Sequence, residues 1–137
     1  MGKILFDMDT MKFTTMFESL THTKLKDCFK EEGGIVFVVM PGYIAKAIGK
    51  QGINVKKISN AIKKNVIIIE FNPDVVEFVK NLVRVRGIAI RKENNNVIIK
   101  CPDTKTKGLV FGREKERLKR AELIVKRYFD IDDIKVE

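Results

Sequence analysis

The sequence predicts an α+β fold made of two copies of one small module. The chain has 137 residues, which suits one ordinary domain or two very small ones. Hydrophobic residues make up 45% of it, enough for a packed core and too many for a disordered chain. Segments with helical or strand-like patterns follow the order helix, strand, strand, helix, helix, strand in each half. Modules this small are marginally stable alone, so we expect them to pack together.

The first half contains the clearest pattern. Residues 35–40 are continuously apolar, as in a strand that is covered on both faces of a sheet. Gly33 and Gly34, in the turn before them, indicate a hairpin. Apolar residues at helical spacing indicate the second of two helices, with Asn54 as its N-cap. The expected elements are a helix over 10–20, strands over 26–30 and 35–40, helices over 43–48 and 54–63, and a strand over 66–71.

The same order of elements follows a boundary at residues 72–74, an Asn-Pro-Asp sequence typical of a turn. Gly112 then separates a short segment from a long helix. We therefore expect two domains, residues 1–72 and 73–137. The elements expected in the second domain are a helix over 74–83, strands over 88–91 and 97–101, a short segment over 104–111, a helix over 114–129 and a strand over 134–136.

One short motif carries chemical information. Ile48 is followed by Gly-Lys-Gln-Gly at residues 49–52, between two predicted short helices. Glycine at both ends removes Cβ atoms, so a sugar–phosphate backbone can come close to the peptide chain. The N–H groups at the start of the next helix point toward phosphate oxygens. A GxxG loop in this setting indicates a KH module, which clamps about four nucleotides of single-stranded RNA. A glycine-rich tight turn between packed helices is the structural alternative.

Lysines around this loop supply positive charge, and Gln51 can hydrogen-bond without fixing the identity of a base. A P-loop does not fit, because Ile53 follows the last glycine where GxxxxGK[ST] requires lysine. No GxGxxG dinucleotide fingerprint is present either. The residues expected to bind RNA in the first half are Ile48, Gly49, Lys50, Gln51, Gly52, Asn54, Lys56 and Lys57.

Composition narrows the remaining function classes. The net charge of +9 favours an anionic partner, either nucleic acid or an acidic membrane surface, without deciding between them. No apolar run approaches the roughly 18 residues needed to span a bilayer, and no signal peptide is evident, so we expect a cytoplasmic protein. The single His22 and the distant Cys28 and Cys101 offer little material for a metal site, a disulfide or a catalytic triad. We therefore expect no enzyme activity, cofactor, membrane partner or small-molecule substrate.

These motifs resemble a known family. Residues 28–29, 35–42 and 47–56 are similar to the first KH domain of the archaeal NusA-like transcription factors. Residues 126–134 are similar to the end of the second KH domain in that family, and the resemblance covers nearly the whole chain. It implies an α+β protein of two tandem type II KH domains, each a three-stranded mixed sheet packed against helices. It also implies that the two domains form one rigid RNA-binding surface.

The second half departs from the family pattern at its loop. Where the family's second KH domain carries another GxxG, this chain has Gly112-Arg113-Glu114-Lys115, so the second glycine is missing. The local charge favours RNA binding, because residues 105–127 contain nine lysines and arginines and only three glutamates. We expect a degenerate loop that attracts RNA electrostatically, and a solvated basic helix face is the alternative. The contacts expected in this half are Gly112, Arg113, Lys115, Arg117 and Arg120.

The resemblance implies a role in transcription elongation or termination. Its implied partners are single-stranded RNA and RNA polymerase or the nascent transcript complex. Two alternatives stay open: a ribosome-associated or RNA-processing KH protein, and a KH-fold module for protein interactions that has lost RNA affinity. Retention of Gly49 and Gly52 within a basic surround speaks against the second alternative.

Overall fold

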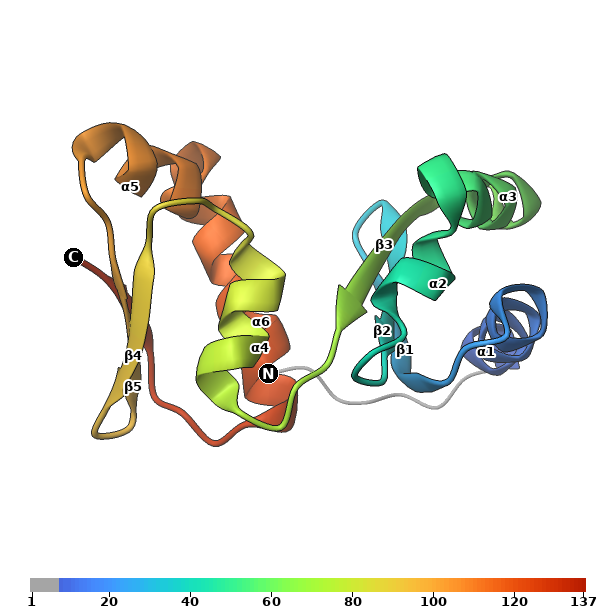
Figure 1. Cartoon of the computed structure of the whole chain (residues 1–137), viewed down its shortest axis with the longest axis horizontal. Helices are drawn as coiled ribbons and strands as arrows, with labels where there is room; N and C mark the ends of the chain where they lie inside the picture. Colours follow the sequence, from blue (N-terminus) through green and yellow to red (C-terminus); the bar gives the residue numbers. More distant parts are fainter. Residues whose placement is uncertain (1–7) are drawn as a thin grey trace. The chain divides into compact units, whose positions relative to one another are not determined.

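A computed structural model describes residues 8–137, which form two compact units that divide between Asn72 and Pro73 (Figure 1). The first unit contains α1 (Met8–Thr21), β1 (Leu25–Glu31), β2 (Gly34–Val39), α2 (Ile44–Ile48), the short 3₁₀ turn η1 (Lys50–Gly52), α3 (Ile53–Ile62) and β3 (Asn65–Glu70). The second unit contains α4 (Val75–Val83), β4 (Ala89–Glu93), β5 (Asn96–Lys100), α5 (Thr104–Phe111), the 3₁₀ turn η2 (Arg113–Lys115), α6 (Glu116–Tyr128) and β6 (Ile134–Val136).

Each unit has one three-stranded mixed sheet. In the first unit the strand order is β1-β2-β3, with β1 antiparallel to β2 and β2 parallel to β3. The second unit repeats this arrangement as β4-β5-β6. The hairpin expected at Gly33 is present, and this glycine has φ +78° in the turn between β1 and β2. The predicted α+β fold with two mixed three-stranded sheets packed against helices is therefore confirmed.

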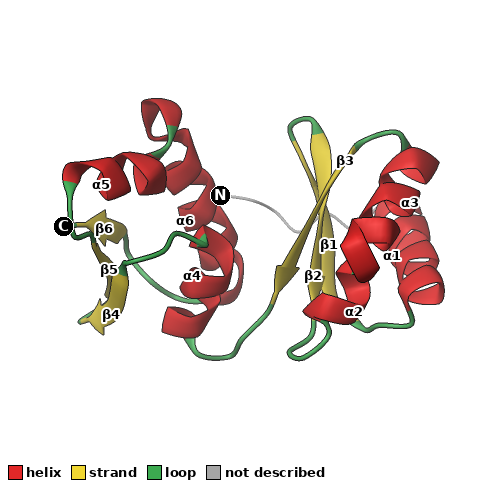
Figure 2. Ribbon diagram, turned by 45° about the horizontal axis from the view of Figure 1, so that its top comes forward, coloured by secondary structure: helices red, strands yellow, loops and turns green. Residues whose placement is uncertain are grey.

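The helices of the first unit cover one face of its sheet. α1, α2 and α3 gather on the same side of the strands (Figure 2). Phe17 of α1, Ala47 of α2 and Ile58 of α3 are fully buried in one cluster with Phe37 of β2. The rings of Phe17 and Phe37 stack with their centroids 4.4 Å apart. Because this core holds α2 and α3, it also fixes the two ends of the loop between them.

In the second unit, aromatic rings join α4 to the end of α6. The centroid of the Phe78 ring lies 5.7 Å from that of Tyr128 and 5.6 Å from that of Phe129. The N-cap of α5 is Asp103, whose carboxylate accepts a hydrogen bond from the Thr106 backbone N–H at 2.7 Å. Hydrogen bonds from the side chain and the backbone of Thr106 hold the pKa of Asp103 below its ordinary value. The cap sets the start of the helix that leads into the second loop.

Every helix and strand expected from the sequence is present, with ends displaced by at most two residues. The expected N-cap of α3 is wrong. Gly52 occupies the cap position, in the left-handed conformation and without a side-chain hydrogen bond, and Asn54 lies inside the first turn. The physical reason is that a glycine with positive φ, rather than a capping side chain, turns the chain into the helix. No helix in the described part of the chain is long and apolar enough to cross a membrane.

Candidate nucleic-acid interface

The first loop (residues 49–52) joins α2 to α3 through a sharp change in backbone direction. Gly49 ends α2 with φ +78° and ψ 171°, Gln51 has φ +56°, and Gly52 has φ +72°. The Gly52 N–H donates to the Gly49 carbonyl at 3.1 Å and closes the turn. The loop therefore leads into the start of α3, where the Ile53 N–H donates to the Lys50 carbonyl and the next N–H groups of the first turn have no acceptor within the helix.

The second loop (residues 112–115) has the same conformation although its sequence differs. Gly112 has φ +69° and ψ −178°, and Glu114 has φ +54°. Lys115 has φ +60° and ψ 16°, where Gly52 of the first loop has φ +72° and ψ 21°. The Lys115 N–H donates to the Gly112 carbonyl at 3.2 Å. The missing second glycine therefore changes the surface of this loop and not its backbone path.

The two glycines of the first loop have different surroundings. A Cβ atom at Gly49 would lie 2.9 Å from Nδ2 of Asn54 and 3.0 Å from Cγ2 of Ile53, and the positive φ of Gly49 also favours glycine. A Cβ atom at Gly112, in the second loop, would lie 2.4 Å from Cβ of Arg117. A Cβ atom at Gly52, by contrast, would meet nothing within 4 Å. The first glycine of each loop thus supports internal packing, whereas Gly52 leaves open space at the surface.

A side chain five residues after the first glycine contacts the helix that precedes each loop. Asn54 Nδ2 donates to the Lys46 carbonyl at 3.1 Å, and Arg117 Nη1 donates to the Leu109 carbonyl at 3.0 Å. Arg117 Nη2 also donates to the Val83 carbonyl at the end of α4, at 3.1 Å. Sequence reasoning assigned Asn54 and Arg117 to RNA contact and missed these bonds. The available signal was a side-chain donor at the same spacing from the first glycine in both halves.

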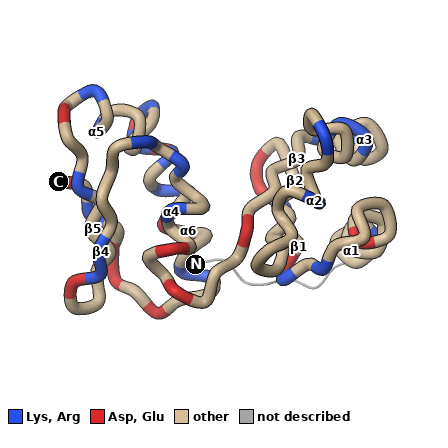
Figure 3. Tube along the Cα trace, viewed as in Figure 1, with Lys and Arg blue, Asp and Glu red and all other residues tan. Residues whose placement is uncertain are grey.

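Exposed lysines surround the first loop. They are Lys46, Lys50, Lys56 and Lys57. α3 contains no acidic residue, and no ion pair in the described part of the chain involves these lysines. Figure 3 shows the resulting positive segments along α3. Because their charge is not neutralised within the protein, these lysines are available to an anionic ligand.

The cations around the second loop differ in their availability. Arg113 and Lys115 are exposed, and Lys115 Nζ lies 5.6 Å from the centre of the Phe111 ring. Arg117 is also exposed, but its guanidinium is held by two backbone carbonyls. Arg120 is half-buried, and its Nη2 atom is buried. Arg113 and Lys115 are therefore the cations of this loop that are best placed to meet a ligand.

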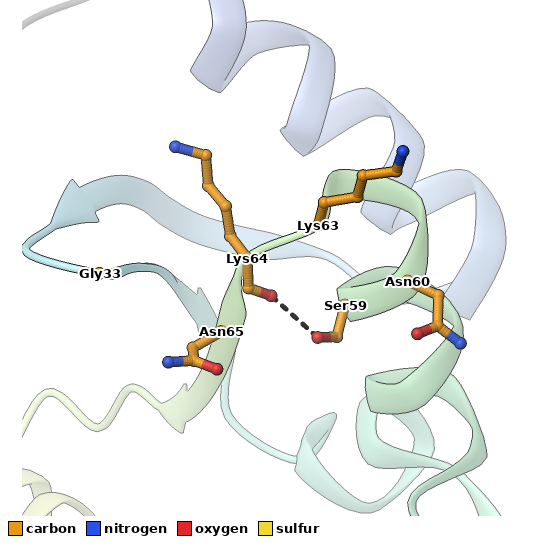
Figure 4. A pocket seen from close by; sticks show the side chains of 6 residues that line it. All are labelled: Gly33, Ser59, Asn60, Lys63, Lys64 and Asn65. Atoms are coloured by element: carbon orange, nitrogen blue, oxygen red, sulfur yellow. Dashed lines mark hydrogen bonds between the residues drawn. The ribbon is translucent and has the colours of Figure 1, made fainter.

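An open polar pocket lies at the far end of α3 from the first loop (Figure 4). Its lining residues are Gly33, Ser59, Asn60, Lys63, Lys64 and Asn65. Ser59 Oγ donates to the Lys64 carbonyl at 2.8 Å, and the Lys63 N–H donates to the Ser59 carbonyl at 2.8 Å. These bonds close the end of the helix. Lys63 and Lys64 thus place two exposed positive charges at this end of α3, as Lys56 and Lys57 do near the first loop.

Within residues 8–137, the cysteine, histidine and carboxylate side chains do not form a metal site. Cys28 and Cys101 are half-buried, and burial raises the pKa of the Cys101 thiol, which lowers its reactivity. The described residues contain no group of His, Cys, Asp and Glu side chains that could hold a metal ion. The candidate site is therefore built from backbone N–H groups and from lysine, arginine and asparagine side chains.

The fold and the loops define a duplicated α+β protein with one basic glycine loop in each copy. No protein-family model matches the chain. It is 30% identical over 141 residues to the probable transcription termination protein NusA of Methanocaldococcus jannaschii, across 99% of this chain and 76% of that protein. It is 28% identical to the protein of the same name from Thermoplasma acidophilum, across 100% of this chain and 98% of that protein. The chain belongs to this archaeal NusA family.

A solved structure described as the crystal structure of APE1850 is also similar. It matches with a TM-score of 0.78 and 26% sequence identity, across 96% of this chain and 100% of that one. The likeness extends over nearly all the elements of both units. The family resemblance inferred from the sequence motifs is confirmed by the archaeal relatives.

Proposed function

We propose that this chain binds single-stranded RNA through two tandem type II KH domains, residues 1–72 and 73–137, and acts in transcription elongation or termination. The order of elements, the parallel pairing of β2 with β3 and the glycine loop between α2 and α3 support the KH assignment. The name of the archaeal relatives supports the place in transcription. The observation that carries the proposal is the open surface at Gly52 beside exposed lysines that form no ion pair with any residue of 8–137.

In this function the first loop holds the sugar–phosphate backbone. The absent Cβ at Gly52 lets the RNA backbone approach the loop, and the N–H groups that follow Ile53 in the first turn of α3 donate to phosphate oxygens. Lys50, Lys56 and Lys57 attract the phosphates, and Gln51 hydrogen-bonds without selecting a base. Backbone contacts of this kind position the RNA and carry no sequence information directly. Ile48, Gly49 and Asn54 complete the proposed interface.

The second domain acts as an electrostatic extension of the first. Lys115 places a Cβ atom and a long side chain where Gly52 leaves open space, so RNA cannot approach this loop as closely. The Lys115 ammonium and the Arg113 guanidinium attract phosphates from further away. Gly112, Arg117 and Arg120 belong to the same proposed surface.

Gly52→Asp tests the clamp. Aspartate adds bulk and negative charge to the open space, so affinity for a single-stranded RNA of about eight nucleotides should fall at least about tenfold. The matched control is Gly87→Asp, because Gly87 also has positive φ (+82°), would bring its Cβ only into ordinary contact, and lies outside both loops. Circular dichroism verifies that both variants fold. A folded Gly52→Asp protein that binds RNA as tightly as the parent would falsify the clamp.

The place in transcription is tested by crosslinking in cells, followed by sequencing of the bound RNA and identification of copurified proteins. Nascent transcripts and RNA polymerase are the expected partners. Recovery with ribosomes would instead favour the ribosome-associated alternative. Recovery with proteins and without RNA would favour an interaction module.

A further inference from the structure

The chain turn at Gly49 removes the backbone partner of one helical carbonyl. The Gly49 N–H donates to the Ala45 carbonyl at 3.0 Å, as in a regular helix. In a continuing helix, the Lys50 N–H would donate to the Lys46 carbonyl, but the turn carries it away. Asn54 Nδ2 donates to the Lys46 carbonyl instead, at 3.1 Å. A side chain from the following helix thus replaces the missing backbone bond.

The end of α5 repeats this arrangement with a different side chain. The Gly112 N–H donates to the Gly108 carbonyl at 2.9 Å. The next carbonyl, that of Leu109, accepts from Arg117 Nη1 at 3.0 Å. Asparagine and arginine have little in common except a terminal N–H donor. The shared contact therefore depends on that donor and on its position five residues after the glycine.

The same two positions account for the common shape of the two loops. The first loop continues with Lys-Gln-Gly after its first glycine and the second with Arg-Glu-Lys, so no residue type is shared at these three positions. The backbone angles nevertheless agree, even between Gly52 at φ +72° and Lys115 at φ +60°. Both loops retain the first glycine and a donor side chain packed against it, Asn54 in one and Arg117 in the other. These retained features hold the loop geometry, and the second glycine is not needed for it.

We propose that Asn54 and Arg117 are positioning residues that set the two loops in their binding shape before a ligand arrives. The inference rests on the proposed RNA-binding function. It adds to that function two residues that affect RNA binding by holding the shape of the loops. A loop that is already shaped loses less conformational entropy on binding, so its affinity for the RNA backbone is higher. In the second unit, Arg117 also holds the end of α4, so the shape of that loop is tied to a third helix.

Asn54→Ala tests the proposal, with Asn60→Ala as the matched control. Asn60 is an exposed asparagine on the same helix and lies beside the pocket at its far end. In the absence of RNA, hydrogen exchange of the Gly52 and Ile53 N–H groups, which close the loop, should become faster in Asn54→Ala alone. Affinity for single-stranded RNA should fall roughly three- to tenfold in Asn54→Ala, with Tm near that of the parent.

A second variant separates the hydrogen bond from the packing. Asn54→Asp keeps the shape of the side chain, but an ionised carboxylate cannot donate to the Lys46 carbonyl, so the loop amides should again exchange faster. Unchanged exchange in both variants would overturn the proposal whatever RNA binding does. Faster exchange with parental affinity in Asn54→Ala would overturn the positioning role. If Gly52→Asp leaves RNA binding intact, the clamp itself fails, and the exchange comparison still decides what Asn54 does.

Discussion

At Lys115 the backbone adopts a conformation that glycine reaches freely and lysine does not. Left-handed angles cost a residue with a Cβ atom about 1–2 kcal/mol. Glu114 in the same loop also has left-handed angles, so the same cost applies to it. Despite this strain, the backbone of the second loop follows the same path as that of the first loop. Strain of this kind persists where the surroundings over-determine the backbone. Here those surroundings are Gly112 and the guanidinium of Arg117.

Lys115→Gly should therefore stabilise the protein. Relief of the left-handed strain outweighs the extra freedom of glycine in the unfolded chain, which leaves a gain of up to about 1 kcal/mol in the free energy of unfolding. Chemical denaturation measures this. The control is Lys119→Gly, which makes the same replacement inside α6, where glycine should cost about 1 kcal/mol. If both variants lose stability to a similar extent, Lys115 is not strained.

The conformation of Lys115 could not be predicted from the sequence. Lysine is a good helix former, so its residue type indicates helical angles and gives no sign of positive φ. The constraint comes from side chains packed around the loop, which residue patterns do not report. The role of Asn54 was missed because asparagine near a helix start indicates an N-cap, and the spacing that it shares with Arg117 does not by itself show that its amide donates to the preceding helix.

At the scale of elements, periodicity and turn residues predicted each helix and strand within two residues. The α3 helix illustrates why: its apolar spacing reports the buried face that includes Ile58 directly. The function of its outward face cannot be predicted in this way, because charge alone does not distinguish a binding surface from a solvated one. Lys56 and Lys57 lie in α3 and Lys63 and Lys64 directly follow its last residue, and all four are exposed lysines, so the sequence cannot rank them as RNA contacts.

The proposed function predicts that the lysines near the first loop contribute more to RNA affinity than those at the far end of α3. Lys56→Ala with Lys57→Ala should weaken binding to a short single-stranded RNA, because these side chains lie beside the clamp. Lys63→Ala with Lys64→Ala removes equal charge from the other end of α3 and should have a smaller effect. The slope of log affinity against log salt should become shallower by about 0.7 for each phosphate that the variant no longer neutralises. Titrations at several salt concentrations give both quantities. Equal losses of affinity from the two pairs would indicate general attraction to a basic surface.

At the scale of the whole molecule, the repeated order of elements predicted the α+β architecture. The pairing of strands within each sheet could not be predicted from the residue pattern. β2 and β3 are parallel neighbours, yet two helices and a loop separate them in sequence. Such pairing depends on how the intervening helices pack, which periodicity does not encode. The mixed sheets were expected from the family resemblance, and they recur in both units.

The two units differ in their basic residues, and this difference predicts what the cations of the second loop contribute to RNA affinity. All seven arginines follow residue 83, so the second unit offers guanidinium groups around a loop that carries the Lys115 side chain where the first loop has Gly52. Arg113→Ala with Lys115→Ala, made in the full chain, should lower affinity to a similar extent for RNAs of different base sequence and flatten the salt dependence. Arg117 is left unchanged, because its bonds to the Leu109 and Val83 carbonyls support the fold.

Duplex RNA of the same length provides the comparison for this double variant. The parent should prefer the single strand, because a KH clamp of the kind proposed at the first loop takes single-stranded RNA, and the preference should survive removal of the second-loop cations. Fluorescence anisotropy with matched single-stranded and duplex RNAs measures both affinities. An altered base preference with an unchanged salt slope would show that the second loop reads bases. Unchanged affinity would show that its cations face water, and equal binding of duplex and single strand by the parent would contradict a clamp of the KH type.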